Sequence, residues 1–275
     1  MKKNGQPIRR LDAARVDFLR DVIAAGEPLI IGRSERGWRK LPRWTPELLA
    51  ERLGRRSVEV AASPSELFDY AANHARYELT RMAFDALVSQ LLRPSRRKPH
   101  LYLMQQPLEP YFPELDQELR MPSFLAKLGV SRQLWLGARG NRTPLHYDTG
   151  HNLFSQIHGR KRFMLFDPTE SAHLYPYPRE SRHPHVSRID PERPDLRSFP
   201  SFSRARAREL VLEPGEHLFL PAGFWHHVRS LDVTISVNAW WTPRPASSRG
   251  KRAEDPAGAR KARDRLRAGP RRRRL

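Results

Sequence analysis

The second half of the chain consists of short apolar segments separated by turn residues, and this pattern restricts the fold more than any other feature. Many short strands at such spacing indicate a β-sandwich or a barrel. Residues 167–208, which are rich in Pro, Arg and Ser, interrupt the series, and a connection of this length usually forms a wall or lid of a site. The expected strands are 134–136, 145–148, 153–157, 161–166, 209–212, 217–220 and 234–241.

The first hundred residues mix helical periodicity with strand-like runs. Apolar residues recur every three or four positions in 12–25 and 78–92, which predicts a helix in each range. Thr45 is a suitable N-cap for a further helix that reaches Leu53, because Pro46 fits the first helical position. Strands are expected at 28–32, 57–60 and 100–105.

Composition limits the kinds of site that the chain can build. With 275 residues and 39% hydrophobic content, the chain can bury a sizeable core as one large domain with extensions. The absence of cysteine excludes disulfides, thiolate zinc sites and a cysteine nucleophile, so any metal must bind to His and carboxylate side chains. No apolar stretch approaches the roughly 18–20 residues that cross a bilayer, and the first residues lack an apolar signal core. We therefore expect a cytoplasmic protein without a membrane partner.

The positive charge is concentrated at the C-terminal end. The chain has a net charge of +20, and residues 244–275 contain 13 Lys or Arg against three acidic residues. This segment is too polar to bury a core, which predicts a disordered basic tail. Such a tail attracts nucleic acid or an acidic partner, although a solvated tail with no partner has the same composition.

Two separated histidine motifs carry the chemistry. In a strand, successive side chains alternate between faces, so His146 and Asp148 point to the same side. A second strand that begins near Phe224 would bring His226 or His227 to the same place, and only one of these neighbours can face it. Two histidines and one carboxylate on one face form the ligand set of non-haem Fe(II) oxygenases. The alternative is that these histidines are ordinary core residues, since a lone His-x-Asp occurs by chance about 0.5 times in such a chain.

Several polar residues are expected near the histidines. Lys161 shares a strand face with apolar residues, where an ammonium group needs an anion, and a dicarboxylate would supply one. Thr143 and Asn152 would add hydrogen bonds to the same carboxylate, and Asn238 would orient this cosubstrate or a water molecule. The alternatives are a solvated basic turn for Lys161 and simple turn chemistry for Thr143 and Asn152.

Together these motifs resemble the JmjC and cupin-like branch of the Fe(II)- and 2-oxoglutarate-dependent oxygenases, particularly the asparaginyl hydroxylase that modifies hypoxia-inducible factor. The resemblance covers about residues 101–241. It implies a mainly β fold with flanking helices, a double-stranded β-helix of the jelly-roll type. The segments that carry the resemblance are 143–148, 152–157, 159–162, 174–178, 197–200, 213–216 and 225–228.

The resemblance also implies residue roles. His146, Asp148 and His226 would bind iron, whereas Lys161 would hold the distal carboxylate of 2-oxoglutarate together with Thr143 and Asn152, with Asn238 nearby. Two departures limit what is carried over. Gly150 replaces a polar residue that contacts peptide in the asparaginyl hydroxylase, and a basic tail replaces the helices that form its dimer. Substrate specificity and oligomeric state are therefore open.

We thus expect N-terminal elements over 1–100 packing on a catalytic core over 101–243, followed by the tail over 244–275. The expected activity is that of a dioxygenase that uses Fe(II), 2-oxoglutarate and O₂ to hydroxylate an amino-acid side chain of a protein or peptide. Demethylation of a basic side chain is a further possibility. Two alternatives are hydroxylation of a modified RNA base, which the charge suits, and a catalytically idle cupin-like binding module.

Overall fold

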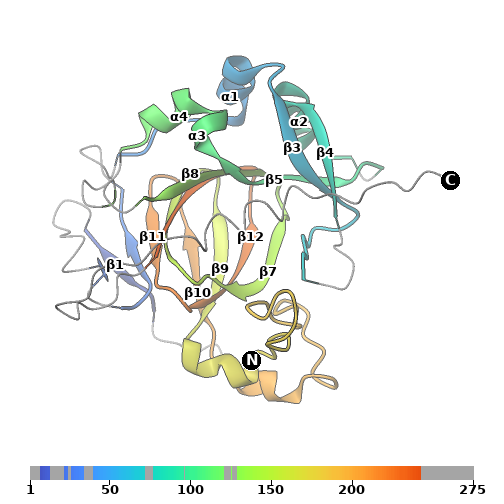
Figure 1. Cartoon of the computed structure of the whole chain (residues 1–275), viewed down its shortest axis with the longest axis vertical. Coiled ribbons are helices and arrows are strands. Elements are labelled where there is room, and N and C mark those ends of the chain that lie inside the picture. The colour runs from blue at the N-terminus through green and yellow to red at the C-terminus, as the bar shows by residue number, and fades with distance from the viewer. Residues whose placement is uncertain are drawn as a thin grey trace. The chain divides into compact units, whose positions relative to one another are not determined.

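The fold is built on two β-sheets, which Figure 1 shows together with their flanking helices. The computed structural model describes residues 7–12, 22–23, 26–33, 40–71, 77–95, 97–120, 125 and 129–242. The strands are β1 (Arg9–Leu11), β2 (Leu29–Ile31), β3 (Ser57–Ser63), β4 (Glu78–Ala83), β5 (His100–Pro107), β6 (Ser131–Gly137), β7 (Arg142–Tyr147), β8 (His151–His158), β9 (Lys161–Phe166), β10 (Arg208–Leu212), β11 (His217–Leu220), β12 (Trp225–Ser230) and β13 (Thr234–Trp241). The helices are α1 (Pro46–Leu53), α2 (Phe84–Leu92), α3 (Leu108–Tyr111) and α4 (Pro113–Glu118), with 3₁₀ helices η4 (Pro168–His173) and η5 (Pro200–Arg204).

The chain passes back and forth between the two sheets. Within the described residues, the larger sheet has the order β1-β2-β11-β8-β13-β6-β5-β3-β4, and the smaller sheet has the order β10-β9-β12-β7. From β6 onward, β6, β8, β11 and β13 lie in the larger sheet, whereas β7, β9, β10 and β12 lie in the smaller one. This alternation produces a double-stranded β-helix, and the predicted fold class is confirmed.

The space between the sheets is filled by apolar side chains from both. Phe154 and Leu218 of the larger sheet pack with Phe163, Leu165 and Leu212 of the smaller one in a single buried cluster. Because strand side chains alternate, every second residue of these strands points into this space. Burial of each such side chain stabilises the fold by about 1.5–3 kcal/mol.

The helices cover the outer face of the larger sheet. Leu49 of α1 and Leu87 of α2 belong to one cluster with Val60, Leu136 and Val237 of the sheet. The start of α1 is set as predicted, because the Thr45 hydroxyl accepts a hydrogen bond from the Leu48 backbone N–H at 3.1 Å. In the part of the chain that the structure describes, no helix is long and apolar enough to span a bilayer.

The predicted helix over 78–92 is wrong in its first half. Residues Glu78–Ala83 form β4, which pairs antiparallel with β3, and the helix begins only at Phe84. Pairing with β3 gives the backbone of this segment its hydrogen bonds, and Leu79 stays 62% exposed. The buried side chains of helical spacing are Phe84, Leu87, Val88 and Leu91. Tertiary pairing therefore overrides the apparent periodicity.

Each predicted strand coincides with an observed strand, and the ends differ by a few residues. Most of the predicted helix over 12–25 lies outside the described residues. Residues 1–243 form one compact unit, in which β1 to β4 join the same sheet as the later strands. The tail over 244–275 lies outside the described residues, so its predicted disorder stays a prediction.

The long connection between β9 and β10 packs against the smaller sheet. Its residues Leu174, Ile189 and Phe202 share a buried cluster with Phe166 and Trp225 of the sheet. The same connection also forms backbone hydrogen bonds with β7, which is the edge strand of the smaller sheet. The Ser187 N–H donates to the Leu145 carbonyl at 2.8 Å, and the Tyr147 N–H donates to the His185 carbonyl at 3.0 Å. We call residues 167–207 the insert.

Candidate metal centre

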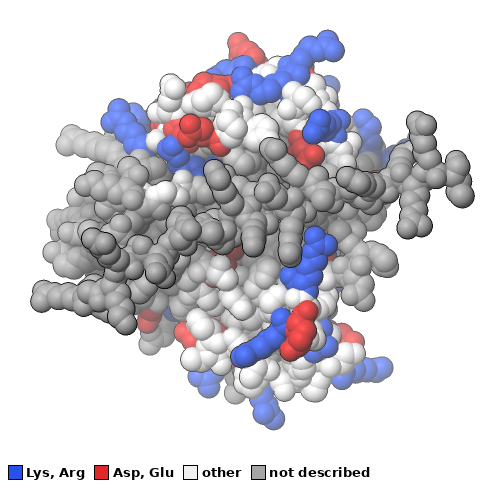
Figure 2. All heavy atoms as spheres, in the orientation of Figure 1, with Lys and Arg blue, Asp and Glu red and all other residues white. Residues whose placement is uncertain are grey.

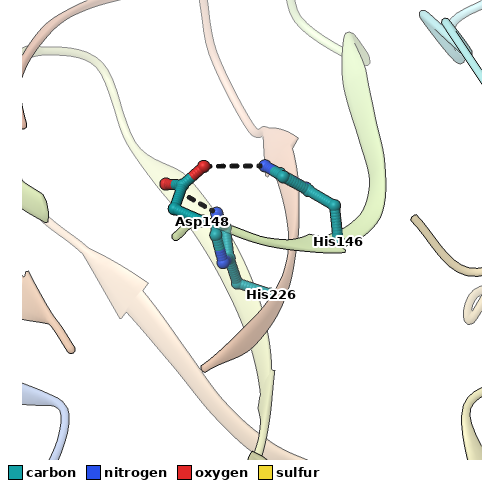
Figure 3. Close-up of side chains that lie close together, drawn as sticks. All are labelled: His146, Asp148 and His226. Carbon is teal, nitrogen blue, oxygen red and sulfur yellow. Dashed lines mark ion pairs between the residues drawn. The ribbon is translucent and has the colours of Figure 1, made fainter. Parts of the chain in front are cut away.

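Three side chains from the smaller sheet converge on one point, as Figure 3 shows. His146 lies on β7, Asp148 follows directly after β7, and His226 lies on β12. His146 and His226 are cross-strand partners, and their ring centroids are 4.1 Å apart. One donor atom from each of the three residues lies within 4.8 Å of the other two. The three donor atoms therefore lie close enough together to bind one ion.

Backbone hydrogen bonds orient both imidazole rings. Nδ1 of His146 lies 2.8 Å from the Pro144 carbonyl, and Nδ1 of His226 lies 3.0 Å from the Phe224 carbonyl. A carbonyl oxygen only accepts, so each Nδ1 carries the proton and each Nε2 presents a lone pair. Both Nε2 atoms face Asp148, at 3.9 Å for His146 and 3.8 Å for His226. This tautomer leaves Nε2 of each ring available to bind a metal.

The electrostatics of the three groups match this arrangement. Burial and the neighbouring His226 lower the pKa of His146 well below its ordinary value, which keeps its imidazole neutral. Burial alone would raise the pKa of Asp148, but His226, His146 and two hydrogen bonds bring it below its ordinary value. At physiological pH, Asp148 is therefore an ionised carboxylate and His146 is a neutral imidazole.

A chain of hydrogen bonds holds the Asp148 carboxylate. The indole N–H of Trp240 donates to Oδ2 at 2.9 Å, and the Asn152 amide donates to the same oxygen at 3.2 Å. Asn238 in turn donates to the Asn152 side-chain oxygen at 3.0 Å. These partners fix the orientation of the aspartate, and its other oxygen, Oδ1, faces His146.

Lys161 lies at the other end of the same cavity. Its ammonium group donates to the hydroxyls of Ser236 at 2.9 Å and Tyr102 at 3.3 Å, and it faces the Phe154 ring at 5.0 Å. Among the described residues, no carboxylate forms an ion pair with it. Burial lowers the pKa of Lys161 to about 7. The fold has therefore placed a desolvated cation next to neutral groups, an arrangement that an added anion would stabilise.

One cavity joins the two ends. It has about 410 Å³ of empty space, part of it open to solvent. Its walls combine polar groups with aromatic rings, as in many small-molecule sites. The lining residues are Tyr102, Gln105, Trp135, Thr143, His146, Asp148, Asn152, Phe154, Lys161, Phe163, His226, Val228, Asn238 and Trp240.

All seven residues predicted for the site line this cavity, but they do not share one task. Thr143 lies at the lysine end, where it forms a hydrogen bond with Tyr102. Asn152 and Asn238 instead belong to the hydrogen-bond chain of Asp148. Their contact with a distal carboxylate stays a prediction.

The roles of Ser236 and Trp240 in the site were not predicted, although strand alternation in the sequence points to both side chains. Ser236 has the same strand parity as Asn238 and Trp240, so alternation alone would have placed its hydroxyl in the cavity. Trp240, two residues after Asn238, donates its indole N–H to the aspartate.

Near the metal ligands, an aromatic group comes from distant segments. Tyr70 lies edge-on to His146 with ring centroids 6.2 Å apart, and it contacts His183 at 5.5 Å and His185 at 6.3 Å. Both histidines belong to the insert, so this connection approaches the metal ligands through Tyr70. Its role as a wall or lid of the site stays a prediction. No periodic pattern in the sequence points to these three residues.

A divalent ion fits the three converging side chains. Distances of 3.8–3.9 Å between the Nε2 atoms and the carboxylate oxygens are too long for hydrogen bonds, so these groups do not satisfy one another. A metal with bonds of about 2.0–2.2 Å to nitrogen and oxygen would bridge them. Two imidazoles and one carboxylate suit iron, and the three ligands leave positions open for small molecules.

Comparison with known proteins agrees with the geometry. A model of the "Cupin-like domain" family matches residues 15–247. Lysine-specific demethylase 8 of Danio rerio is 39% identical over 147 residues, which cover 51% of this chain and 36% of that protein. Jumonji C domain-containing protein 5 of Drosophila melanogaster is 30% identical over 244 residues, covering 85% of this chain and 59% of that protein.

A third relative is named for RNA chemistry. The tRNA wybutosine-synthesizing protein 5 of Danio rerio is 29% identical over 265 residues, which cover 90% of this chain and 78% of that protein. The matches to the first two relatives span 36% and 59% of the length of those proteins. The closer resemblance to the asparaginyl hydroxylase stays a prediction.

Proposed function

The chain belongs to the cupin-like domain family of the JmjC type, and from this premise we propose that it is a dioxygenase that uses Fe(II), 2-oxoglutarate and O₂. The observation that carries the proposal is that one cavity contains both the His146, Asp148 and His226 group and the ammonium of Lys161, which forms no ion pair among the described residues. The first would bind the metal, and the second would bind an anionic cosubstrate.

Iron, when bound, supplies the redox chemistry that couples the oxidative decarboxylation of 2-oxoglutarate to oxidation of the substrate. The residues of the chain contribute position and environment. His146 and His226 present Nε2 lone pairs from rings that the backbone fixes. Trp240 and Asn152 hold the Asp148 carboxylate in one orientation. Three pre-oriented ligands reduce the reorganisation needed for binding.

Lys161 would fix the far carboxylate of 2-oxoglutarate. The ammonium group already lies in the cavity, where hydrogen bonds to Ser236 and Tyr102 orient it. A carboxylate bound there would favour the charged form of Lys161 and form a charge-assisted hydrogen bond. The rings of Phe154, Phe163 and Trp135 line the same cavity and make part of its wall apolar.

Turnover without the final substrate tests the proposal. The protein with Fe(II), 2-oxoglutarate and O₂ is expected to form succinate slowly. His146→Ala and Asp148→Ala should lower this reaction about a thousandfold. Asp232→Ala should retain it, because Asp232 is a partly exposed residue outside the cavity that bonds to the side chain and backbone N–H of Arg160. Absence of succinate from the wild-type protein would favour the alternative of an idle binding module.

For the substrate, we propose an amino-acid side chain of a protein, which would be hydroxylated. The names of relatives such as lysine-specific demethylase 8 support a protein substrate. Mass spectrometry of candidate peptides after incubation distinguishes the two reactions. Hydroxylation adds one oxygen atom, whereas demethylation of a methylated lysine or arginine removes a methyl group and releases formaldehyde.

The alternative of an RNA substrate has two observations in its favour. One relative is named a tRNA wybutosine-synthesizing protein, and the chain has a net charge of +20. On the face in Figure 2, however, the Lys and Arg side chains of the described residues lie among Asp and Glu side chains. If RNA is the substrate, tRNA affinity should fall with salt, and deletion of residues 244–275 should reduce that dependence.

A further inference from the structure

Three arginines form a row across the outer face of the smaller sheet, on the side away from the cavity. Arg229 of β12 lies directly opposite Arg142 of β7 and Arg162 of β9. Neighbouring residues on the same strands, Val228 and Lys161, face the cavity instead. Like charges in directly opposed positions destabilise a sheet. The row therefore requires anions behind the strands that carry the metal ligands.

The insert supplies the central anion, Glu192. One oxygen of its carboxylate accepts from Arg162 at 2.6 Å, and both oxygens accept from the Arg229 Nε at 2.9 and 3.0 Å. The second oxygen lies 3.5 Å from Nη1 of Arg142. The Glu192 side chain is only 10% exposed, and that of Arg142 is 8% exposed. One buried carboxylate thus contacts all three strands of the row.

Two further carboxylates balance the row. Asp190, also from the insert, accepts from Arg142 at 2.7 Å, and Glu66 accepts from Arg229 at 3.1 Å. The described cluster then has three arginines and three carboxylates. Burial would raise the pKa of Glu192, but His227 and Arg229 hold it well below its ordinary value, so it stays ionised.

The cluster is connected to the metal ligands on both strands. Nε2 of His227 lies 3.4 Å from the Glu192 carboxylate, and His227 is the chain neighbour of His226. On the other strand, residue Val186 of the insert forms a bridge with His146. The insert therefore contacts the chain neighbour of His226 and pairs with the backbone of His146.

We propose that Glu192 is a positioning residue for the metal centre: by joining the insert to the arginine row and to His227, it holds β7 and β12 so that His146 and His226 face one ion. This inference rests on the proposed function. It makes the insert a structural part of the metal centre.

Affinity for Mn(II), measured by calorimetry without O₂, tests this role without relying on activity. Glu192→Gln is expected to weaken Mn(II) binding about tenfold, as with other residues that orient ligands. The affinity of the Mn(II)-loaded protein for 2-oxoglutarate should change little, because Lys161 lies on the cavity side of β9. Asp195→Asn is the matched control, since Asp195 is an insert carboxylate whose bonds are to turn backbone.

The double variant Glu192→Gln, Arg229→Gln separates positioning from stability. It removes one positive charge along with the negative one, so thermal stability should recover relative to Glu192→Gln. Mn(II) affinity should stay reduced, because His227 still lacks its carboxylate neighbour.

Wild-type Mn(II) affinity in either variant would overturn the role of Glu192. Absence of Mn(II) binding by the wild-type protein would instead overturn the proposed function itself.

Discussion

The two ends of the cavity are suited to ligands of opposite charge. At one end, the Asp148 carboxylate lies among His146 and His226 and accepts hydrogen bonds from Trp240 and Asn152. At the other end, Lys161 has only neutral partners among the described residues. The first end is completed by a cation and the second by an anion. This difference indicates a site for a metal and an anionic molecule that bind together.

The largest effect is expected at the metal end. Asp148→Ala removes the only carboxylate of the metal-binding group, so bound Mn(II) should be lost and succinate formation should fall about a thousandfold. Metal analysis after gel filtration and a succinate assay measure the two losses. Asp232→Ala is the control. Retention of one equivalent of metal by Asp148→Ala would place the ion elsewhere.

A change at the lysine end should leave the metal end intact. Lys161→Met is expected to raise KM for 2-oxoglutarate about 100-fold, because a charge-assisted contact in a buried site is lost. Mn(II) affinity should be unchanged. Without 2-oxoglutarate the variant should unfold at a higher temperature, because no buried ammonium remains.

Arg160→Met serves as the control, because Arg160 is next to Lys161 but pairs with Asp232 at the surface. If Lys161→Met lowered the affinity for both the metal and 2-oxoglutarate, this would contradict the claim that the two ends of the cavity bind their ligands independently.

The pH dependence of binding sharpens the same contrast. Burial lowers the pKa of Lys161 to about 7, so the ligand-free group loses its proton as the pH rises above that value. Affinity for 2-oxoglutarate should therefore fall about tenfold between about pH 7 and 8.5, with proton uptake on binding. Calorimetry in buffers of different ionisation enthalpy measures this uptake.

The same shift has a defined sign for stability. The folded pKa lies below the unfolded value of 10.5, so the unfolded chain binds more protons between about pH 7 and 10.5. The free energy of unfolding of the ligand-free protein should rise with pH across this window, and the rise should be smaller in Lys161→Met. Identical profiles for the two proteins would contradict a neutralised lysine.

A smaller effect is expected when one hydrogen bond to the Asp148 carboxylate is removed. Trp240→Phe removes the N–H that donates to Asp148 and should weaken Mn(II) binding about tenfold. Trp135→Phe is a matched control from the same cavity, because the Trp135 indole N–H has no hydrogen-bond partner among the described residues. Equal effects of the two variants would show that ring volume matters more than the hydrogen bond.

The smallest effect should lie outside the cavity. Thr45→Ala removes the N-cap of α1 and should lower the free energy of unfolding by about 1 kcal/mol. Metal and 2-oxoglutarate affinities should not change, as measured by denaturation and calorimetry. A change at either end of the cavity would show that the outer helices influence the site.

Local patterns predicted the parts of the site that lie on regular strands. Alternation placed His146 with Asp148, and it placed Lys161 and Asn238 in the interior. The choice of His226 over its neighbour needed the family resemblance, and the structure turns His227 toward Glu192 instead.

Contacts made by irregular segments could not be predicted, because they depend on tertiary packing. Tyr70, His183 and His185 come from two segments without periodicity, so no spacing rule relates them to the metal ligands. The strand Glu78–Ala83 was misassigned for a related reason, since its pairing with β3 depends on a partner that is distant from its own local pattern.

A crystal structure of the protein prepared without O₂, with Mn(II) and the inert analogue N-oxalylglycine, tests the central claim most directly. We expect one ion bound by His146, Asp148 and His226, with the far carboxylate of the analogue in contact with Lys161. An ion bound at other residues, or an analogue whose carboxylate leaves Lys161 without a partner, would contradict this assignment of the two ends.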